Sequence, residues 1–335
     1  MEGLWHWAPH AGGPYTCQKR RGALHERATS GAASGKTTVT HKAPRIGLAL
    51  GSGSARGWAH IGVIRAFEHA GISPDIVCGT SVGALVGAAY AAGAIDRLEP
   101  WVKGLRWQTV MSLLDVKVSG GLIEGSKLVE FFRARFADEG IARLPKAFGC
   151  VATDLASGRE VWLREGSVID AVRASIALPG LLTPVQRDGR LLVDGGLVNP
   201  VPVSLCRAMG ADIVVAVDLN WDLIGRRRQI PDDVQTSVSG PGGGLIDAML
   251  ARFRSVGPLS GSSGMPSVLD VLTTSLNIMQ VRITQSRLAG EPADVMIRPR
   301  LSGIAAMDYH RGAAAIAQGE HAAAQALPLI QDLIA

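Results

Sequence analysis

Short apolar runs bounded by glycine or proline alternate with helical patterns along most of the chain. The runs at residues 45–50 (RIGLAL) and 75–79 (DIVCG) are continuous rather than alternating, as in strands buried on both faces. Helical patterns follow them at residues 58–69 and 81–92. A strand followed by a helix, repeated, predicts an α/β fold with a mostly parallel central sheet and helices on both faces.

The remaining apolar segments extend this architecture. A hairpin is predicted at residues 184–196, turning at Asp188 and Gly189, because Asp-Gly suits a tight two-residue turn. Further strands are predicted at residues 148–155, 159–165, 211–219 and 293–300. Helices are predicted at residues 127–136, 168–175, 203–208 and 268–289 and at the C-terminus.

Two segments lack such patterns. Residues 1–43 are basic and rich in Gly, Ala, Ser and Thr, which predicts a disordered leader. Residues 221–264 carry RRR and GPGGG and predict a flexible insertion. There is no internal repeat, so residues 44–335 are expected to form one domain.

Composition narrows the classes of partner. The chain has 335 residues, 47% of them hydrophobic, and a net charge of +5. Residues 1–45 hold seven Lys and Arg against two Glu, which accounts for the whole excess, so the neutral body gives no argument for nucleic-acid binding. The four cysteines lie far apart, as expected in a reducing cytoplasm.

The apolar stretches also bear on membranes. The longest, at residues 82–95, is too short to span a bilayer, and the N-terminus lacks the apolar region of a signal peptide. We therefore expect a cytoplasmic protein, with peripheral contact at the inner membrane left open. No protein partner is indicated.

Two glycine-rich stretches resemble nucleotide-binding loops and fail on spacing. SGAASGKTT has Ser30 where a phosphate-binding P-loop needs glycine. GSGSARG has Arg56 where a dinucleotide-binding fingerprint needs its third glycine, which comes one residue late at Gly57. A nucleotide-binding function is therefore not expected.

The sequence GTSVG fits the nucleophile elbow G-x-S-x-G. Ser81 stands between Gly79 and Gly83 at a predicted strand-to-helix turn, where the strained backbone requires small neighbours. The following helix places its positive end at the hydroxyl. An incidental N-capping serine is the alternative interpretation of this turn.

The loop GSGSARG also joins a strand to a helix. Its small residues could point backbone amides at an anion, and beside a serine nucleophile that anion would be the oxyanion of a tetrahedral intermediate. The candidate residues of this oxyanion hole are Gly51, Ser52, Gly53, Ser54, Arg56 and Gly57.

A serine nucleophile needs a base. None of the eight histidines occupies the loop after a late strand, where an α/β-hydrolase histidine belongs, and His60 is interpreted as a helix-packing residue. Asp194 follows a predicted strand and precedes Gly195 and Gly196, so its carboxylate could serve as the base. An ordinary Asp-Gly-Gly turn is the alternative.

Several stretches, in order, resemble the bacterial patatin-like phospholipase family: IGLALGSGSARGWAHIGVI, GTSVGALVGAAYAAG, VATDLASGRE, RASIALPGLLTPV, LLVDGGLVNPVPVSL and GADIVVAVDL. The resemblance implies an acyl-lipid hydrolase with a Ser81–Asp194 dyad and an oxyanion hole around Gly53 and Ser54. It implies no metal and no cofactor. Plant-type members carry three glycines where this chain has Ser52, Gly53 and Ser54. No family role is assigned to Asp154, which is interpreted as a turn cap.

Two expectations complete the functional hypothesis. The stretches at residues 178–185 and 84–93 could line an apolar groove for an acyl chain, although burial in the core explains both equally well. The alternative function is a weakly active regulatory or scaffolding protein that retains the fold. The intact motifs argue against it.

Overall fold

The structure is a computed structural model of the chain, and it describes residues 43–109, 130, 133, 140–224 and 268–335. Residues 43–335 belong to one compact unit, and residues 1–42 are not part of it. The predicted leader, the predicted helix at residues 127–136 and most of the predicted insertion lie outside the described residues. The elements described below belong to the unit of residues 43–335.

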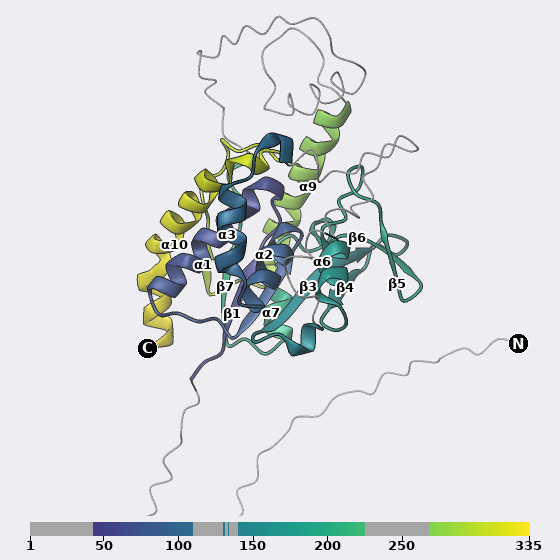
Figure 1. Cartoon of the computed structure of the whole chain (residues 1–335). Coiled ribbons are helices and arrows are strands. Elements are labelled where there is room, and N and C mark those ends of the chain that lie inside the picture. Colours follow the sequence, from purple (N-terminus) through teal and green to yellow (C-terminus); the bar gives the residue numbers. More distant parts are fainter. Residues whose placement is uncertain (1–42, 110–129, 131–132, 134–139, 225–267) are drawn as a thin grey trace, which may run out of the picture. The chain divides into compact units, whose positions relative to one another are not determined.

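One sheet of eight strands forms the centre of this unit (Figure 1). Five strands are parallel, in the order β3 (Ala147–Asp154), β2 (Ile76–Thr80), β1 (Ile46–Leu50), β7 (Ile213–Val217) and β8 (Val295–Ile297). Antiparallel to their neighbours are β4 (Glu160–Leu163), β5 (Val185–Arg187) and β6 (Arg190–Asp194). The mostly parallel sheet predicted from the sequence is confirmed.

Helices cover both faces of this sheet. On one face Leu48 and Leu50 of β1 belong to the larger apolar core, which also includes residues of α1 (Ala59–His69), α2 (Val82–Ala91), α6 (Val168–Ser175) and α10 (Gly312–Ile334). On the other face Ala49 packs with α7 (Val203–Ala208) in a second core, against which Leu288 near the end of α9 (Val268–Gly290) also packs. Successive β1 side chains therefore serve opposite cores.

Helix α1 packs closely along α10. A Cβ on Gly62 would lie 1.9 Å from the carbonyl oxygen of Ile316, and one on Gly319 would lie 1.9 Å from that of Ala59. Helix α3 (Ile95–Lys103) lies beside this pair (Figure 1). Only glycine permits the two backbones to approach so closely.

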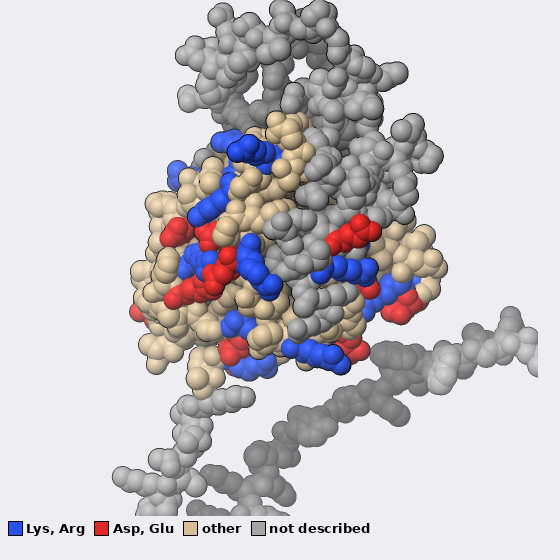
Figure 2. Space-filling view, in the orientation of Figure 1, with Lys and Arg blue, Asp and Glu red and all other residues tan. Residues whose placement is uncertain are grey.

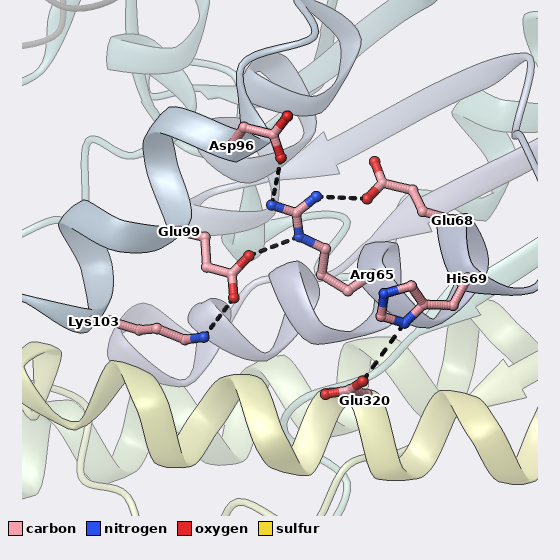
Figure 3. Close-up of polar contacts among 7 residues, drawn as sticks. All are labelled: Arg65, Glu68, His69, Asp96, Glu99, Lys103 and Glu320. Carbon is pink, nitrogen blue, oxygen red and sulfur yellow. Dashed lines mark hydrogen bonds and ion pairs between the residues drawn. The ribbon is translucent and has the colours of Figure 1, made fainter.

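Ion pairs join α1 to α3 at the surface (Figure 3). Arg65 contacts Asp96 and Glu99 of α3, and Glu68 of its own helix, each at 2.7 Å. Lys103 also pairs with Glu99, at 2.6 Å, and the pKa of that carboxyl is lowered by these two cations. Helix α3 was not predicted from the sequence, because Pro100 interrupts its pattern.

The arrangement of β2 and β6 fixes where the candidate site forms. Strand β2 pairs with β3 up to Val151, and β6 pairs with β3 from Ala152 onward, while β4 occupies the opposite edge of β3. The strands β2 and β6 therefore meet end to end along one side of β3. The residues at the junction are Thr80 and Asp194.

The predicted hairpin and its turn are confirmed. Asp188 and Gly189 have φ values of 50° and 74°, as a two-residue turn between twisted strands requires. Strand β8 is shorter than predicted, covering only Val295–Ile297. The predicted helix at residues 58–69 also begins differently, with a 3₁₀ turn at Ser54–Trp58 before α1.

Candidate active site

Ser81 occupies a strained turn between β2 and α2. Its φ of 56° and ψ of −126° lie in a region that non-glycine residues rarely adopt. Its backbone N–H donates to the Ser175 hydroxyl at 2.9 Å, and Ser175 in turn donates to the Val151 carbonyl at 2.6 Å. These hydrogen bonds hold the turn against β3 and leave the Ser81 hydroxyl directed at the junction of β2 and β6.

The two flanking glycines are sterically required. A Cβ on Gly79 would lie 2.4 Å from the backbone of Ala84, and one on Gly83 would lie 2.1 Å from the Leu50 carbonyl oxygen. Both contacts are with backbone atoms of well-packed elements, so no side-chain rotation relieves them. This is the small-neighbour requirement expected of an elbow.

Asp194 faces Ser81 from the end of β6. The Ser81 hydroxyl donates to Asp194 Oδ2 at 2.5 Å, and the Gly196 N–H donates to Oδ1 at 2.7 Å. The carboxyl group is only 1% exposed, and burial raises its pKa to about 6 despite these two hydrogen bonds. At neutral pH the group is ionised, yet it is more basic than an ordinary aspartate.

Asp194 is held by its backbone as well. Its N–H donates to the Ala177 carbonyl at 2.9 Å, and its own carbonyl accepts from the Thr153 hydroxyl at 2.8 Å. A Cβ on Gly195 would lie 2.2 Å from the Val151 carbonyl oxygen, so this position too requires glycine. The base motif therefore runs close against β3.

Two residues of the loop from Gly51 to Gly57 line the pocket that contains Ser81 and have backbone amides without an acceptor among the described residues. The N–H groups of Gly51, Ser52, Ala55 and Arg56 donate to backbone carbonyls. Within the described part of the chain, the N–H groups of Gly53 and Ser54 have no acceptor, and both residues line the pocket that contains Ser81. Ser54 has a φ of 50°, which non-glycine residues rarely adopt.

His60 supports this loop through a hydrogen bond to the backbone of Gly51. Its Nε2 lies 2.8 Å from the Gly51 carbonyl oxygen, and because a carbonyl only accepts, Nε2 carries the proton. Burial lowers the pKa of His60 to about 4, so the ring is neutral at physiological pH. His60, His69, His310 and His321 are the histidines within the described residues, and none of them lines the pocket.

The pocket around Ser81 is open to solvent and contains about 850 Å³ of space between atoms, including its open part. Its lining includes Leu178 and Leu181, from one of the two stretches expected to line an acyl groove. The other stretch, residues 84–93, contributes nothing to this lining. That expectation was wrong, because α2 is buried in the core beneath the turn.

Helix α9 supplies one wall of the pocket, which sequence reasoning did not anticipate. Leu276, Asn277 and Gln280 line it. The Oε1 atom of Gln280 accepts from the Ser52 hydroxyl at 3.2 Å and from the Asn220 side chain at 3.3 Å. The helix therefore contacts the glycine loop directly, and no motif in α9 signals this.

A buried arginine completes the polar layer of the pocket. Arg56 lines the pocket and donates to Asn220 Oδ1 at 3.2 Å and to Asn277 Oδ1 at 3.5 Å. It thereby connects the glycine loop to α9 a second time. Asp154, in contrast, lies outside the pocket lining and accepts from the Ala156 N–H at 3.0 Å, which confirms the turn-cap interpretation.

The described residues also bear on metal binding, membrane insertion and the cysteines. They contain no group of three or more His, Cys, Asp or Glu side chains arranged to hold a metal ion. None of the described helices combines the length and the apolar character needed to cross a bilayer. Cys78, Cys150 and Cys206 are free and buried, as expected of core residues.

Comparison with known proteins places these features in a family. Residues 48–207 match the family model described as patatin-like phospholipase. An uncharacterised NTE family protein of Mycobacterium tuberculosis is 34% identical over 329 residues, covering 85% of this chain and 91% of that protein. The lysophospholipase NTE1 of Pyricularia oryzae is 32% identical over 274 residues, covering 79% of this chain but 17% of the fungal protein. By the extent of these matches, the chain is a member of the patatin-like phospholipase family.

Proposed function

We propose that the protein hydrolyses acyl esters of lipids through an acyl-serine intermediate, with Ser81 as nucleophile and Asp194 as base. Family membership supports lipid ester hydrolysis in general. The observation that carries the specific proposal is the 2.5 Å hydrogen bond from the Ser81 hydroxyl to Asp194 Oδ2. It puts a proton acceptor at the hydroxyl without any histidine.

In the acylation step the Ser81 oxygen attacks the ester carbonyl carbon and its proton passes to Asp194. The former carbonyl oxygen becomes an oxyanion, for which the free N–H groups of Gly53 and Ser54 are the proposed donors. The intermediate then collapses. The bond to the alcohol breaks, and the leaving alcohol takes the proton from Asp194.

Deacylation repeats these steps with water. Asp194 takes a proton from the attacking water, and the second oxyanion accepts hydrogen bonds from the same amides. The bond from Ser81 to the acyl carbon then breaks. Ser81 recovers its proton from Asp194, and the fatty acid is released. A pKa of about 6 suits this role, because the carboxylate is ionised at neutral pH and still accepts a proton in each step.

For the substrate we propose a phospholipid or lysophospholipid, as for a phospholipase A or lysophospholipase. Leu178, Leu181 and Leu276 give the pocket an apolar wall suited to an acyl chain. A relative is named as a lysophospholipase, which favours a substrate with one chain. Such lipids reside in bilayers and micelles, so we also propose a cytoplasmic enzyme that works in peripheral contact with the inner membrane.

The test is covalent labelling combined with turnover. A fluorophosphonate probe should label the wild-type protein at Ser81 and leave Ser81→Ala unlabelled. The same pair is then assayed on p-nitrophenyl esters of increasing chain length, on phosphatidylcholine and on lysophosphatidylcholine. Equal labelling of both proteins would refute the nucleophile. Labelling without hydrolysis of any ester would favour the regulatory or scaffolding alternative.

A further inference from the structure

The N-terminal half of α9 exposes an unusual concentration of large apolar side chains. Of nine exposed large hydrophobic residues among those described, four lie on this helix. Val271 is 48% exposed, Leu272 54%, Ile278 44% and Met279 48%. Single exposed apolar residues are ordinary on protein surfaces, but a contiguous group marks a surface that contacts something.

These four residues form two adjacent rows along the helix. Val271 and Ile278 are seven residues apart, as are Leu272 and Met279, so each pair spans two turns on one side. We call this set the α9 apolar stripe. Figure 1 shows this half of α9 projecting beyond the neighbouring helices at the top of the view. The stripe is thus placed to meet a surface larger than a single ligand.

The stripe continues into the active-site pocket. Leu272 belongs to both, since it is exposed and also lines the pocket with Ser81. On the next turns Leu276 and Gln280 of the same helix line the pocket interior. An acyl chain that passes from a lipid phase to the stripe can therefore follow α9 into the pocket that contains Ser81.

One exposed cation of α9 lies close to the stripe. Arg282, one turn from Ile278 and Met279, is exposed. Arg287 of the same helix pairs with Glu160 at 2.7 Å, and Asp270 directly precedes Val271. Over the described surface that Figure 2 shows, acidic and basic side chains are interspersed. An exposed arginine one turn from apolar side chains suits a lipid surface, where the guanidinium can contact anionic headgroups.

We infer that the α9 apolar stripe is the surface with which the protein lies on a lipid bilayer, so that the acyl chain of the ester enters past Leu272. The inference rests on the proposed function for the identity of the substrate. A second copy of the chain fits less well, because a stable dimer buries about 800 Å² per partner. Four half-exposed side chains on one helix do not supply that area.

The test measures vesicle binding separately from turnover. Full-length Ser81→Ala protein is sedimented with phosphatidylcholine vesicles, with and without phosphatidylglycerol. The stripe variant adds Val271→Ser, Ile278→Ser and Met279→Gln, none of which lines the pocket. The control adds Leu329→Ser and Leu333→Ser, two residues of α10 that are also exposed. Melting temperatures confirm that all variants fold.

The stripe variant should bind vesicles at least tenfold more weakly, whereas the α10 control should bind like the parent. Arg282→Gln should cost about fivefold, and only on vesicles with phosphatidylglycerol. Equal binding by the parent and the stripe variant would overturn the inference. So would a dimer in the parent that the stripe variant dissociates, because the stripe would then face a second copy.

A second readout separates this inference from the proposed function. In the wild-type Ser81 background, the stripe variant should react with a soluble fluorophosphonate at the parental rate and lose hydrolysis of vesicle lipid. Failure of the parent to react would refute the proposed function, while the vesicle-binding result with Ser81→Ala would still decide the stripe. Equal loss of both reactions would overturn the stripe as a docking surface.

Discussion

Thr80 and Asp194 pair with consecutive residues of β3, Thr80 with Val151 and Asp194 with Ala152. Two strands that run in opposite directions thus end against each other on one side of a third. The residue after Thr80 is Ser81, so its hydroxyl meets the Asp194 carboxylate without a long loop to position either group. The backbone of the sheet, rather than side-chain packing, sets their separation.

Asp194→Asn should abolish turnover and fluorophosphonate labelling while the fold is retained. The amide Oδ1 can still accept from the Gly196 N–H, but the side chain can no longer accept the Ser81 proton. A loss of at least a thousandfold in kcat/KM is expected, at the level of about 4 kcal/mol in the barrier. Residual activity above a tenth of wild type would contradict Asp194 as the base.

The pH dependence of activity should follow the ionisation of Asp194. Because its pKa is raised to about 6 and the base must be ionised, kcat/KM should rise with pH and level off above about pH 7. A profile measured from pH 4.5 to 8.5 on a soluble ester checks this. A midpoint near pH 4, as for an exposed aspartate, would contradict the buried base.

The ionisation of Asp194 should lower the free energy of unfolding as pH rises. Its folded pKa lies above the unfolded value of 3.8, so the protonated form favours the folded state below pH 3.8. That contribution is lost as pH rises through about 6. At pH 8 Asp194→Asn should therefore raise the free energy of unfolding, by up to about 3 kcal/mol. Chemical denaturation at pH 8 measures it, and a destabilised variant would contradict the expectation.

His60 should act as a positioning residue for the glycine loop. His60→Leu removes the donor to the Gly51 carbonyl and leaves that buried oxygen unsatisfied, at a cost of about 1–3 kcal/mol in stability. We expect kcat to fall about tenfold with KM little changed, because the loop amides are the proposed donors to the oxyanion of the transition state. His60→Gln restores a donor of similar reach and should recover most of kcat. Equal kcat in the two variants would show that the contact is only structural.

The lowered pKa of His60 also predicts that acid destabilises the folded protein. Its pKa is lowered from 6.5 to about 4, so its neutral form stabilises the fold above pH 6.5 and this contribution is lost as pH falls toward 4. Thermal melts of wild type and His60→Gln between pH 7 and 4 measure the difference. The glutamine variant should lose less stability over this range.

Gly83→Ala should be strongly destabilising. Its Cβ would lie 2.1 Å from the Leu50 carbonyl oxygen, and the turn cannot shift without moving β1. A loss of about 3 kcal/mol or more is expected, read from thermal or urea denaturation. Gly303→Ala is the matched control, because nothing lies within 4 Å of its added Cβ. Similar losses in both variants would contradict the steric argument.

Much of the fold could be predicted from local signals. The strand–helix units around β1 and β2 follow from continuous apolar runs and glycine turns, and the β5–β6 hairpin follows from Asp188 and Gly189. Helix α3 could not be predicted in the same way because Pro100 breaks its pattern. The resemblance to a family linked Ser81 to Asp194, but nothing local predicts that β2 and β6 meet end to end.

The surroundings of the site were harder to predict than its motifs. Ser175 accepts a hydrogen bond from the Ser81 N–H, although its stretch RASIALPG indicated no such contact, and Gln280 contacts Ser52 from 228 residues away in the sequence. Such contacts arise from tertiary packing, which periodicity does not encode. The groove expected beside α2 was wrong for the same reason, since an alanine-rich helix suits a core and a channel equally well.

Because the ends of β2 and β6 meet only in the assembled sheet, the return of hydrolytic activity should report when the centre of the sheet forms during refolding. Ser81 and Asp194 are 113 residues apart in the sequence. They come together only when β2 and β6 have both paired with the edge of β3 that β4 does not occupy. Partly folded chains with intact β1–α1 and β2–α2 units would hold the nucleophile without its base. In a refolding experiment, the return of esterase turnover should therefore lag behind the return of helix content, and the delay measures how long the centre of the sheet takes to assemble.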